Sequence, residues 1–145
     1  MIQKFTVSHD PDIYQAWPDV ALTPSGRLVC VFAECKHHVD RSYTRIMLCD
    51  STDRGRTWSS KRPLTEGTGA GEAFYNCPRI TQMRDGRLCV VVDRCPQGEV
   101  KVRSMYAISL LYFSADEGVT WSEPVATPLH GIVPDRLLEL SDGRW

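Results

Sequence analysis

The densest group of chemically active side chains lies between Cys35 and Arg45, in a stretch that reads Cys-Lys-His-His-Val-Asp-Arg-Ser-Tyr-Thr-Arg. It follows an apolar run, so we expect a loop at the end of a strand. Asp40 is its one carboxyl group, and it stands among cations and imidazoles that suit proton transfer to a bound ligand. A solvated surface loop is the plainer alternative. The adjacent histidines are expected to point in different directions, which disfavours a metal site.

Three more charged residues each follow a proline at the start of an apolar segment. They are Asp19, Arg79 and Asp135. If the segments line a common axis, burial of these charges is costly unless they pair with one another or with a ligand. An ion network around the axis and a substrate-binding role use the same geometry, and both interpretations stay open.

The elements that position these residues are indicated by an eight-residue motif that occurs twice. Residues 51–58 and 114–121 share the pattern Ser-x-Asp-x-Gly-x-Thr-Trp and lie 63 residues apart. Each copy follows an apolar run, which is the context of a hairpin turn. The Asp can accept backbone N–H groups further along the turn, the Gly tolerates positive φ, and the Trp can pin the turn to its sheet. We interpret both copies as structural turns, with members Ser51, Asp53, Gly55, Thr57 and Trp58 in the first and Ser114, Asp116, Gly118, Thr120 and Trp121 in the second.

A longer repeat of about 60 residues surrounds the motif, with Gly-Arg turns at Gly26, Gly86 and Gly143. Each complete unit is expected to hold four strands, and no segment shows helical periodicity over a useful length. The expected strands are 19–23, 28–34, 43–49 and one from 58, then 79–83, 88–93, 106–114 and one from 121. The stretches expected to be flexible connections between units are 67–71 and 127–131.

Units of this size predict an all-β fold, a β-propeller of four-stranded antiparallel blades. Blade 1 is expected at about 14–66, blade 2 at about 73–127, and the inner hairpin of a third blade at about 131–145. A closed propeller takes typically four to eight blades. We therefore expect this sequence to be the N-terminal part of a longer protein whose remaining blades are its partners. A homotrimer that pools two blades per chain is the alternative.

Composition argues against several classes of partner. The net charge is −1 with 24% charged residues, so no nucleic-acid footprint is indicated. No apolar stretch approaches the roughly 18 residues of a membrane span, and residues 1–10 lack the apolar core of a secretory signal. We expect a cytoplasmic protein with no membrane partner, no cofactor and no metal. The six cysteines form no CxxC pair and are expected to be reduced and mostly buried, with a disulfide framework as the alternative.

The repeated motif resembles the Asp-box of sialidases and related β-propellers, in which it marks the outer part of each blade, away from the catalytic centre. Two further segments are similar to that family. Residues 31–34, Val-Phe-Ala-Glu, resemble the end of a sialidase strand, and residues 76–78, Asn-Cys-Pro, resemble the start of the second blade. The resemblance covers essentially the whole chain and implies a six-bladed propeller.

The resemblance also implies roles for individual residues. Asp40 lies within one residue of the family's general acid/base, and Lys36 stands where the family has an Arg. The other implied substrate contacts are charged or amide side chains, namely Arg41, Arg79, Asp19, Asn76 and Glu99. Ala16 replaces the first Arg of the family's three-Arg carboxylate clamp, and Lys36 offers a point charge in place of a planar fork. The family's Tyr nucleophile and its partner Glu would come from later blades.

The function implied by the resemblance is exo-glycosidic hydrolysis of a terminal sialic-acid-like or other acidic sugar, with a glycan or small sugar as substrate. Asp40 would protonate the leaving oxygen, as a partly desolvated carboxyl with a raised pKa can. One alternative is a non-catalytic carbohydrate- or protein-binding propeller. Another is a glycosidase of the same fold for an uncharged sugar, which would explain the lost clamp. We expect the 145-residue chain alone to be inactive.

Overall fold

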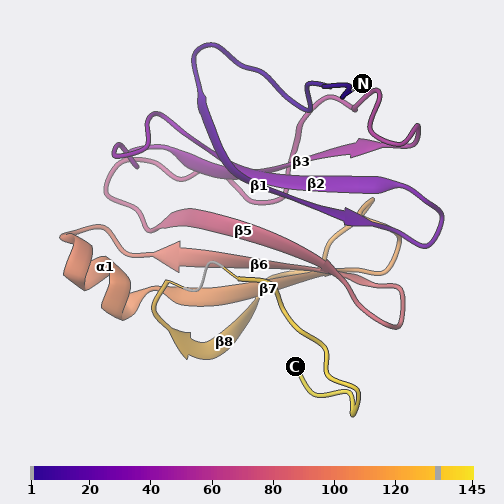
Figure 1. Cartoon of the computed structure of the whole chain (residues 1–145). Helices are drawn as coiled ribbons and strands as arrows, with labels where there is room; N and C mark the ends of the chain where they lie inside the picture. Colours follow the sequence, from indigo (N-terminus) through magenta and orange to yellow (C-terminus); the bar gives the residue numbers. More distant parts are fainter. Residues whose placement is uncertain (1, 133–134) are drawn as a thin grey trace.

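The computed structural model describes residues 2–132 and 135–145, so Val133 and Pro134 of the third repeat lie outside the described residues. Two four-stranded antiparallel sheets stack face to face (Figure 1). The first has the strand order β1 (Tyr14–Leu22), β2 (Leu28–Cys35), β3 (Thr44–Ser51), β4 (Arg62–Pro63). The second has the order β5 (Phe74–Gln82), β6 (Leu88–Cys95), β7 (Ile108–Ser114), β8 (Val125–His130). A short helix, α1 (Val100–Tyr106), lies in the connection between β6 and β7.

The all-β class and the two four-stranded antiparallel units are confirmed, but several expected boundaries are wrong. The first strand of each sheet begins five residues earlier than expected, because pairing with its neighbour continues past a bulge. The last strands begin at Arg62 and Val125, about four residues later than expected, since the residues after each motif Trp complete the turn. Residues 127–130 belong to β8 and are no connection. The helix α1 was not expected, because seven residues are too few for periodicity to be read.

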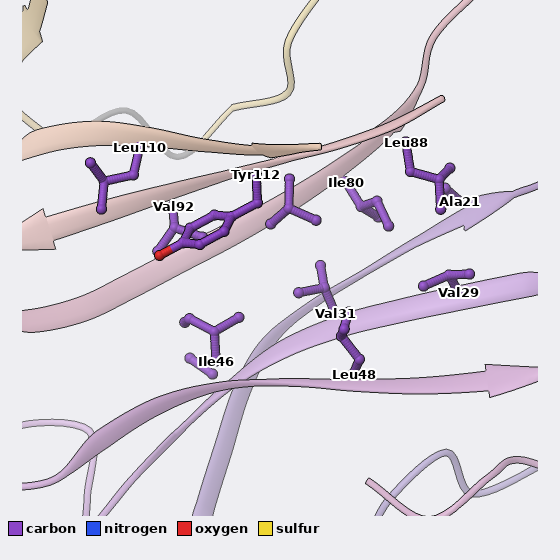
Figure 2. Close-up of a cluster of buried hydrophobic side chains, with 12 residues drawn as sticks. Ala21, Val29, Val31, Ile46, Leu48, Ile80, Leu88, Val92, Leu110 and Tyr112 are labelled. Carbon is purple, nitrogen blue, oxygen red and sulfur yellow. The ribbon is translucent and has the colours of Figure 1, made fainter. Parts of the chain in front are cut away.

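The main core fills the space between the two sheets (Figure 2). Val29 and Val31 of β2 point toward the second sheet, and Val90 and Val92 of β6 point back toward the first. Since successive residues of a strand face opposite sides, the residues between them face outward. Those outward residues are also buried, in separate clusters that include Val7 on the first sheet and Leu137 on the second. Burial on both faces explains why β2 and β6 are continuous apolar runs.

The six cysteines are all free and buried, as expected for small apolar side chains. Burial raises the pKa of each thiol, to about 12 for Cys30, Cys89 and Cys95. A buried thiol with so high a pKa is inert as a nucleophile.

The two motif copies form matching hairpin turns. In the second copy Asp116 Oδ1 accepts the Thr120 backbone N–H at 2.9 Å and Oδ2 accepts the Thr120 hydroxyl at 2.6 Å. Ser114 Oγ donates to Asp116 Oδ1 at 2.8 Å and accepts the Gly118 N–H at 2.8 Å. The Trp121 indole N–H donates to the Gly118 carbonyl at 3.2 Å. The first copy repeats every one of these contacts within 0.2 Å, so the two copies form the same hydrogen-bonded turn.

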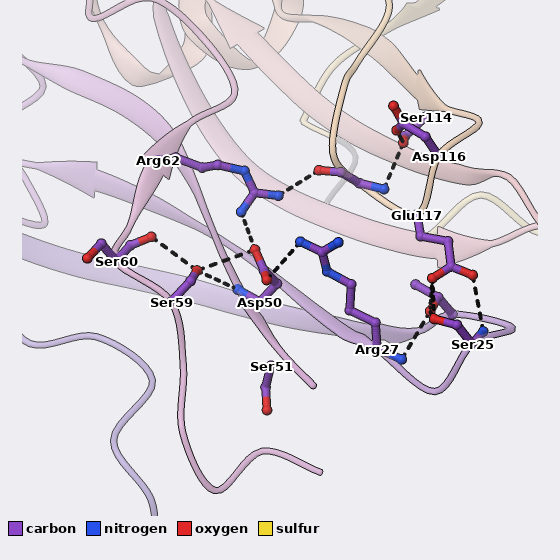
Figure 3. Close-up of polar contacts among 12 residues, drawn as sticks. Ser25, Arg27, Asp50, Ser51, Ser59, Ser60, Arg62, Ser114, Asp116 and Glu117 are labelled. Carbon is purple, nitrogen blue, oxygen red and sulfur yellow. Dashed lines mark hydrogen bonds and ion pairs between the residues drawn. The ribbon is translucent and has the colours of Figure 1, made fainter. Parts of the chain in front are cut away.

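The second motif turn also joins the two sheets (Figure 3). The carboxylate of Glu117 accepts the Thr23 hydroxyl at 2.9 Å and the Ser25 backbone N–H at 3.1 Å, both in the β1–β2 hairpin. Arg62 of β4 donates to the Gly118 carbonyl at 2.6 Å and pairs with Asp50. We call these contacts the inter-sheet latch. The first motif turn carries Arg54 at the position of Glu117. The latch therefore runs from the motif turn of the second sheet to the first sheet.

The carboxylate of Asp116 makes stability depend on acidity. Hydrogen bonds from Thr120 lower its pKa to about 2 in the folded chain, against about 3.9 when unfolded. The stabilisation is complete above about pH 4 and is lost as the pH falls through about 2. We expect the free energy of unfolding to fall between pH 4 and 2 more steeply in the native chain than in Asp116→Asn, by urea denaturation at fixed ionic strength. Asp12→Asn, at an exposed carboxyl outside the motif turns, is the control; equal slopes in Asp116→Asn and the native chain would contradict the expectation.

The cost of a methyl group at the two motif glycines should differ. Gly118 and Gly55 have φ of 85° and 80°, so Ala at either costs about 1–2 kcal/mol of backbone strain. A Cβ at Gly118 would lie 3.2 Å from Val29 of the other sheet, whereas one at Gly55 would meet Leu28 at 3.4 Å and Trp58 at 3.6 Å. We expect Gly118→Ala to lower the free energy of unfolding by about 1 kcal/mol more than Gly55→Ala, measured by urea denaturation. Equal losses would mean that the second turn does not press on the neighbouring sheet.

Candidate functional site

The strand register places the connecting loops at two opposite ends of the sheets. Ser51 pairs with Leu28 and Ser114 with Leu88, so both motif turns lie beside the β1–β2 and β5–β6 hairpins. The loops 36–43 and 96–107 therefore emerge at the opposite end, beside the first residues of β1 and β5. We call this the loop end; in Figure 1 it is the end that carries α1.

β1 and β5, which we call the inner strands, each contain a bulge near the loop end. Pairing shifts between Ala16 and Asp19 in β1 and between Asn76 and Arg79 in β5. Within the bulges Trp17 has φ of 53° and Cys77 has φ of 45°, a conformation that non-glycine residues seldom adopt. Bulges of this kind re-aim the neighbouring side chains, and strained backbone of this kind clusters at functional sites.

Aromatic rings gather around the first bulge. The Trp17 ring lies 5.7 Å from the His38 ring and 6.4 Å from the Tyr14 ring, between centroids. The guanidinium carbon of Arg41 stands 4.5 Å from the Trp17 centroid, within cation–π range. Arg41 also donates from Nη1 to the Cys35 sulfur at 2.9 Å, which fixes the plane of its guanidinium. The loop 36–43 is thus held against the start of β1 by one cation and three rings.

A cavity of about 250 Å³ opens between this cluster and the second sheet. Asn76 and Arg103 line it, and each has a buried polar atom, Oδ1 and Nε respectively, with no hydrogen-bond partner among the described residues. The guanidinium carbon of Arg103 stands 5.7 Å from the Phe74 ring centroid. Gln97 of the β6–β7 connection donates to the Arg41 carbonyl at 3.4 Å and so joins the two loops. The described residues that line it are His38, Val39, Arg41, Phe74, Asn76, Arg103 and Ile132.

Asp40 is exposed and closes a turn of its own loop. Its Oδ1 accepts the Ser42 backbone N–H at 2.9 Å. The hydrogen bond from the Ser42 hydroxyl, followed by the one from the Ser42 backbone N–H, lowers the pKa of Asp40. The charges of Lys36 and His37 act in the same direction. The expected raised pKa is therefore wrong for the chain without a ligand, because the carboxyl lies in water and accepts hydrogen bonds.

Asp19, Arg79 and Asp135, which each follow a proline, were expected to converge on one axis. Their contacts in the structure differ from that expectation. Asp19 forms an ion pair with Arg136 and accepts the Ile80 backbone N–H at 3.0 Å. Arg79 donates to two backbone carbonyls, those of Pro78 at 2.8 Å and Trp17 at 3.4 Å. Asp135 is exposed. Both Asp19 and Arg79 thus link the two sheets.

The remaining candidates lie apart from the cavity lining. Lys36 is exposed, and Glu99 is an exposed residue at the N-cap of α1 without a side-chain cap bond. Glu34 is buried and pairs with Lys61 at 2.6 Å on the outer face of the first sheet. The structure therefore brings together Arg41 and Asn76 from the expected set, with Asp40 nearby in sequence.

Sequence reasoning did not find Arg103, Phe74 or Trp17. The signal for Trp17 was present, since Trp17-Pro18 and Cys77-Pro78 occupy equivalent positions before the charged residues. Arg103 and Phe74 carried no signal, because their contact depends on where α1 places Arg103 relative to β5. In the described part of the chain no three His, Cys, Asp or Glu side chains gather as metal ligands would, and no helix there is long and apolar enough to cross a bilayer.

Comparison with known proteins gives likenesses among solved structures only. No family model and no curated protein matches the chain. The Hadza microbial sialidase Hz136 superposes with a TM-score of 0.66 at 25% identity, over 77% of this chain and 25% of the sialidase. A protein of unknown function from Dyadobacter fermentans gives 0.72 at 15% identity, over 96% and 47% of the two chains. The GH93 α-L-arabinofuranosidase of Fusarium graminearum, solved with arabinobiose, gives 0.56 at 20% identity, over 87% and 34%.

The chain thus spans between a quarter and about half of the length of these structures. The sialidase and the arabinofuranosidase are β-propeller glycosidases, and the two sheets have the architecture of neighbouring blades. The likeness establishes a glycosidase-like β-propeller fold without specifying a substrate.

Proposed function

We propose that the chain supplies part of the substrate site of a sialidase-like exo-glycosidase, which hydrolyses a terminal sialic-acid-like or other acidic sugar. The observation that carries the proposal is the cavity at the loop end, where Arg41 and Asn76 of adjacent sheets meet beside the loop of Asp40. Its volume of about 250 Å³ is below the roughly 300–1,000 Å³ of sites for drug-sized ligands, so it suits one sugar ring or part of one.

In this proposal Asp40 is the general acid. Its carboxyl is ionised in the free chain, so it has to gain a proton when substrate binds. A bound sugar excludes water from the loop, and desolvation raises the pKa of a carboxyl. Asn76 Oδ1, which accepts no hydrogen bond among the described residues, is placed to accept one from a sugar hydroxyl. Arg41 and Lys36 hold anionic groups, and Asp19 and Arg79 keep the two inner strands in place.

A non-catalytic sugar-binding propeller is the second candidate. Two observations favour it: Ala16 stands where the first clamp Arg of sialidases is expected, and Asp40 has a lowered pKa without ligand. In that case the loop end would bind a sugar and leave its glycosidic bond intact.

Turnover by the protein, in the longest form that its gene encodes, tests the proposal. We expect hydrolysis of a fluorogenic sialoside or uronide, and a loss of about 10²–10⁴-fold in kcat for Asp40→Asn, the range for removal of a general acid. The test includes sugar binding by Asp40→Asn, which should persist. Binding without turnover by the native protein would replace the enzyme with the binding propeller.

The acidity of Asp40 can be measured in the free chain. We expect Ser42→Ala to raise the pKa of Asp40 toward about 3.9, because the hydroxyl of Ser42 is the largest cause of its depression. Carboxyl ¹³C chemical shifts across pH 2–6 give the value for each residue. Asp85 lies at the opposite end, where Arg87 lowers its pKa, and its titration should not change. An Asp40 that titrates at its ordinary value in the native chain would show that the turn is not formed.

A further inference from the structure

We propose that the loop-end cavity is a receptor for the anionic group of a sugar, held between the guanidinium groups of Arg41 and Arg103. The identity of the ligand as a sugar rests on the proposed function above, whereas the anion site rests on the cavity itself. Arg103 is the new element, a specificity-determining residue supplied by α1 of the second sheet.

The side chains of Arg41 and Arg103 both lie on aromatic rings without a bound anion. Arg41 lies over the Trp17 ring and Arg103 over the Phe74 ring, at 4.5 and 5.7 Å between guanidinium carbon and centroid. Stacking on a ring face leaves the N–H edge of a guanidinium accessible to a planar or tetrahedral anion. In Arg41 the Nη1 group already donates to Cys35 Sγ, so an anion would bind its remaining N–H groups. The side-chain entropy that such long residues lose on binding is therefore largely lost before the ligand arrives.

The hydrogen-bonding state of the cavity defines the complementary ligand. Arg103 Nε is a buried donor and Asn76 Oδ1 a buried acceptor, and neither has a partner in the described part of the chain. A buried polar group without a partner costs about 1–3 kcal/mol, which a ligand that supplies the partner recovers. An anionic oxygen would satisfy Arg103 and a hydroxyl would satisfy Asn76. A carboxylate or sulfate on a hydroxylated ring carries both.

Two acidic residues, Asp40 and Asp93, lie beside the cavity-lining residues Arg41 and Asn76. Within residues 2–132 and 135–145 neither Arg41 nor Arg103 forms an ion pair with a carboxylate. Asp93 lies across from Asn76 in the β5–β6 register, fully buried, where Ser109 Oγ donates to it at 3.3 Å. Asp40 is turned toward Ser42. An arriving anion therefore meets two guanidinium groups, neither of which forms an ion pair with a carboxylate of the described residues.

Titration of the ¹⁵N-labelled 145-residue chain tests this site through the Nε–H resonance of Arg103. The ligands are N-acetylneuraminate, glucuronate, glucose 6-sulfate, glucose and inorganic sulfate. We expect the acidic sugars to move that resonance downfield and to bind at least tenfold more tightly than glucose, with an affinity that falls as salt rises. Comparison of carboxylate with sulfate sugars identifies which anion fits.

Variants separate recognition from folding. Arg103→Gln should weaken acidic sugars by about 10-fold or more, since a hydrogen bond to a charged group contributes about 1.5–3 kcal/mol. Arg103→Lys keeps the charge without the fork and should fall between the two. Arg56→Gln makes the same change of charge at the motif-turn end and should bind as the native chain does. Near-ultraviolet circular dichroism verifies that each variant is folded.

Each remaining outcome decides between the two proposals. Equal binding of glucose and glucuronate would overturn the anion receptor and leave the glycosidase proposal standing. A response to inorganic sulfate with no response to any sugar would support the anion receptor and count against the glycosidase. No response of Arg103 to any anion, or unchanged affinity in a folded Arg103→Gln, would overturn the receptor.

Discussion

Each sheet of this chain has to be covered on both faces, and the rest of the structure follows from that constraint. β2 and β6 bury apolar side chains on both sides, so a sheet exposed on either face would present a large apolar surface to water. The facing sides cover each other. Burial of apolar surface contributes about 25 cal/mol per Å², so this contact stabilises the fold.

Face-to-face packing also brings together the parts that could bind a ligand. The sheets meet along their inner strands, and Asp19 just after the bulge of β1 accepts the backbone N–H of Ile80 in β5. Both strands bulge at that point, and Arg79 crosses between them to reach the Trp17 carbonyl. The latch at the other end holds the same spacing through Glu117 and Gly118. The inter-sheet latch and the proposed binding site therefore lie at opposite ends of the same pair of sheets.

The sequence predicted the parts of the fold that are local and repeated. Both motif turns, the β1–β2 and β5–β6 hairpins and the cores of β2 and β6 follow from side chains within a few residues of one another, and the second copy corroborates the first. The inner strands were predicted too short because Trp17 and Cys77 leave the extended conformation, and strand pairing resumes beyond them only through tertiary contact. In the candidate site, Arg41 and Asn76 were expected from the resemblance to sialidases. Arg103 was not, because a seven-residue helix has no period and its meeting with Phe74 joins residues of different elements.

The difference between Lys36 and the two ring-stacked arginines, Arg41 and Arg103, bears on the ligand proposed for the loop end. Lys36 is exposed, so it can attract an anion over a distance but cannot fix its orientation. Arg41 and Arg103 lie on rings of different sheets, and their spacing is set by the packing of those sheets. A ligand that bridges them therefore also binds across the interface between the sheets, and it stabilises the pair by mass action. In the proposed receptor, Arg41 and Arg103 would bind an anion between neighbouring blades even though Ala16 stands where sialidases have their first clamp Arg.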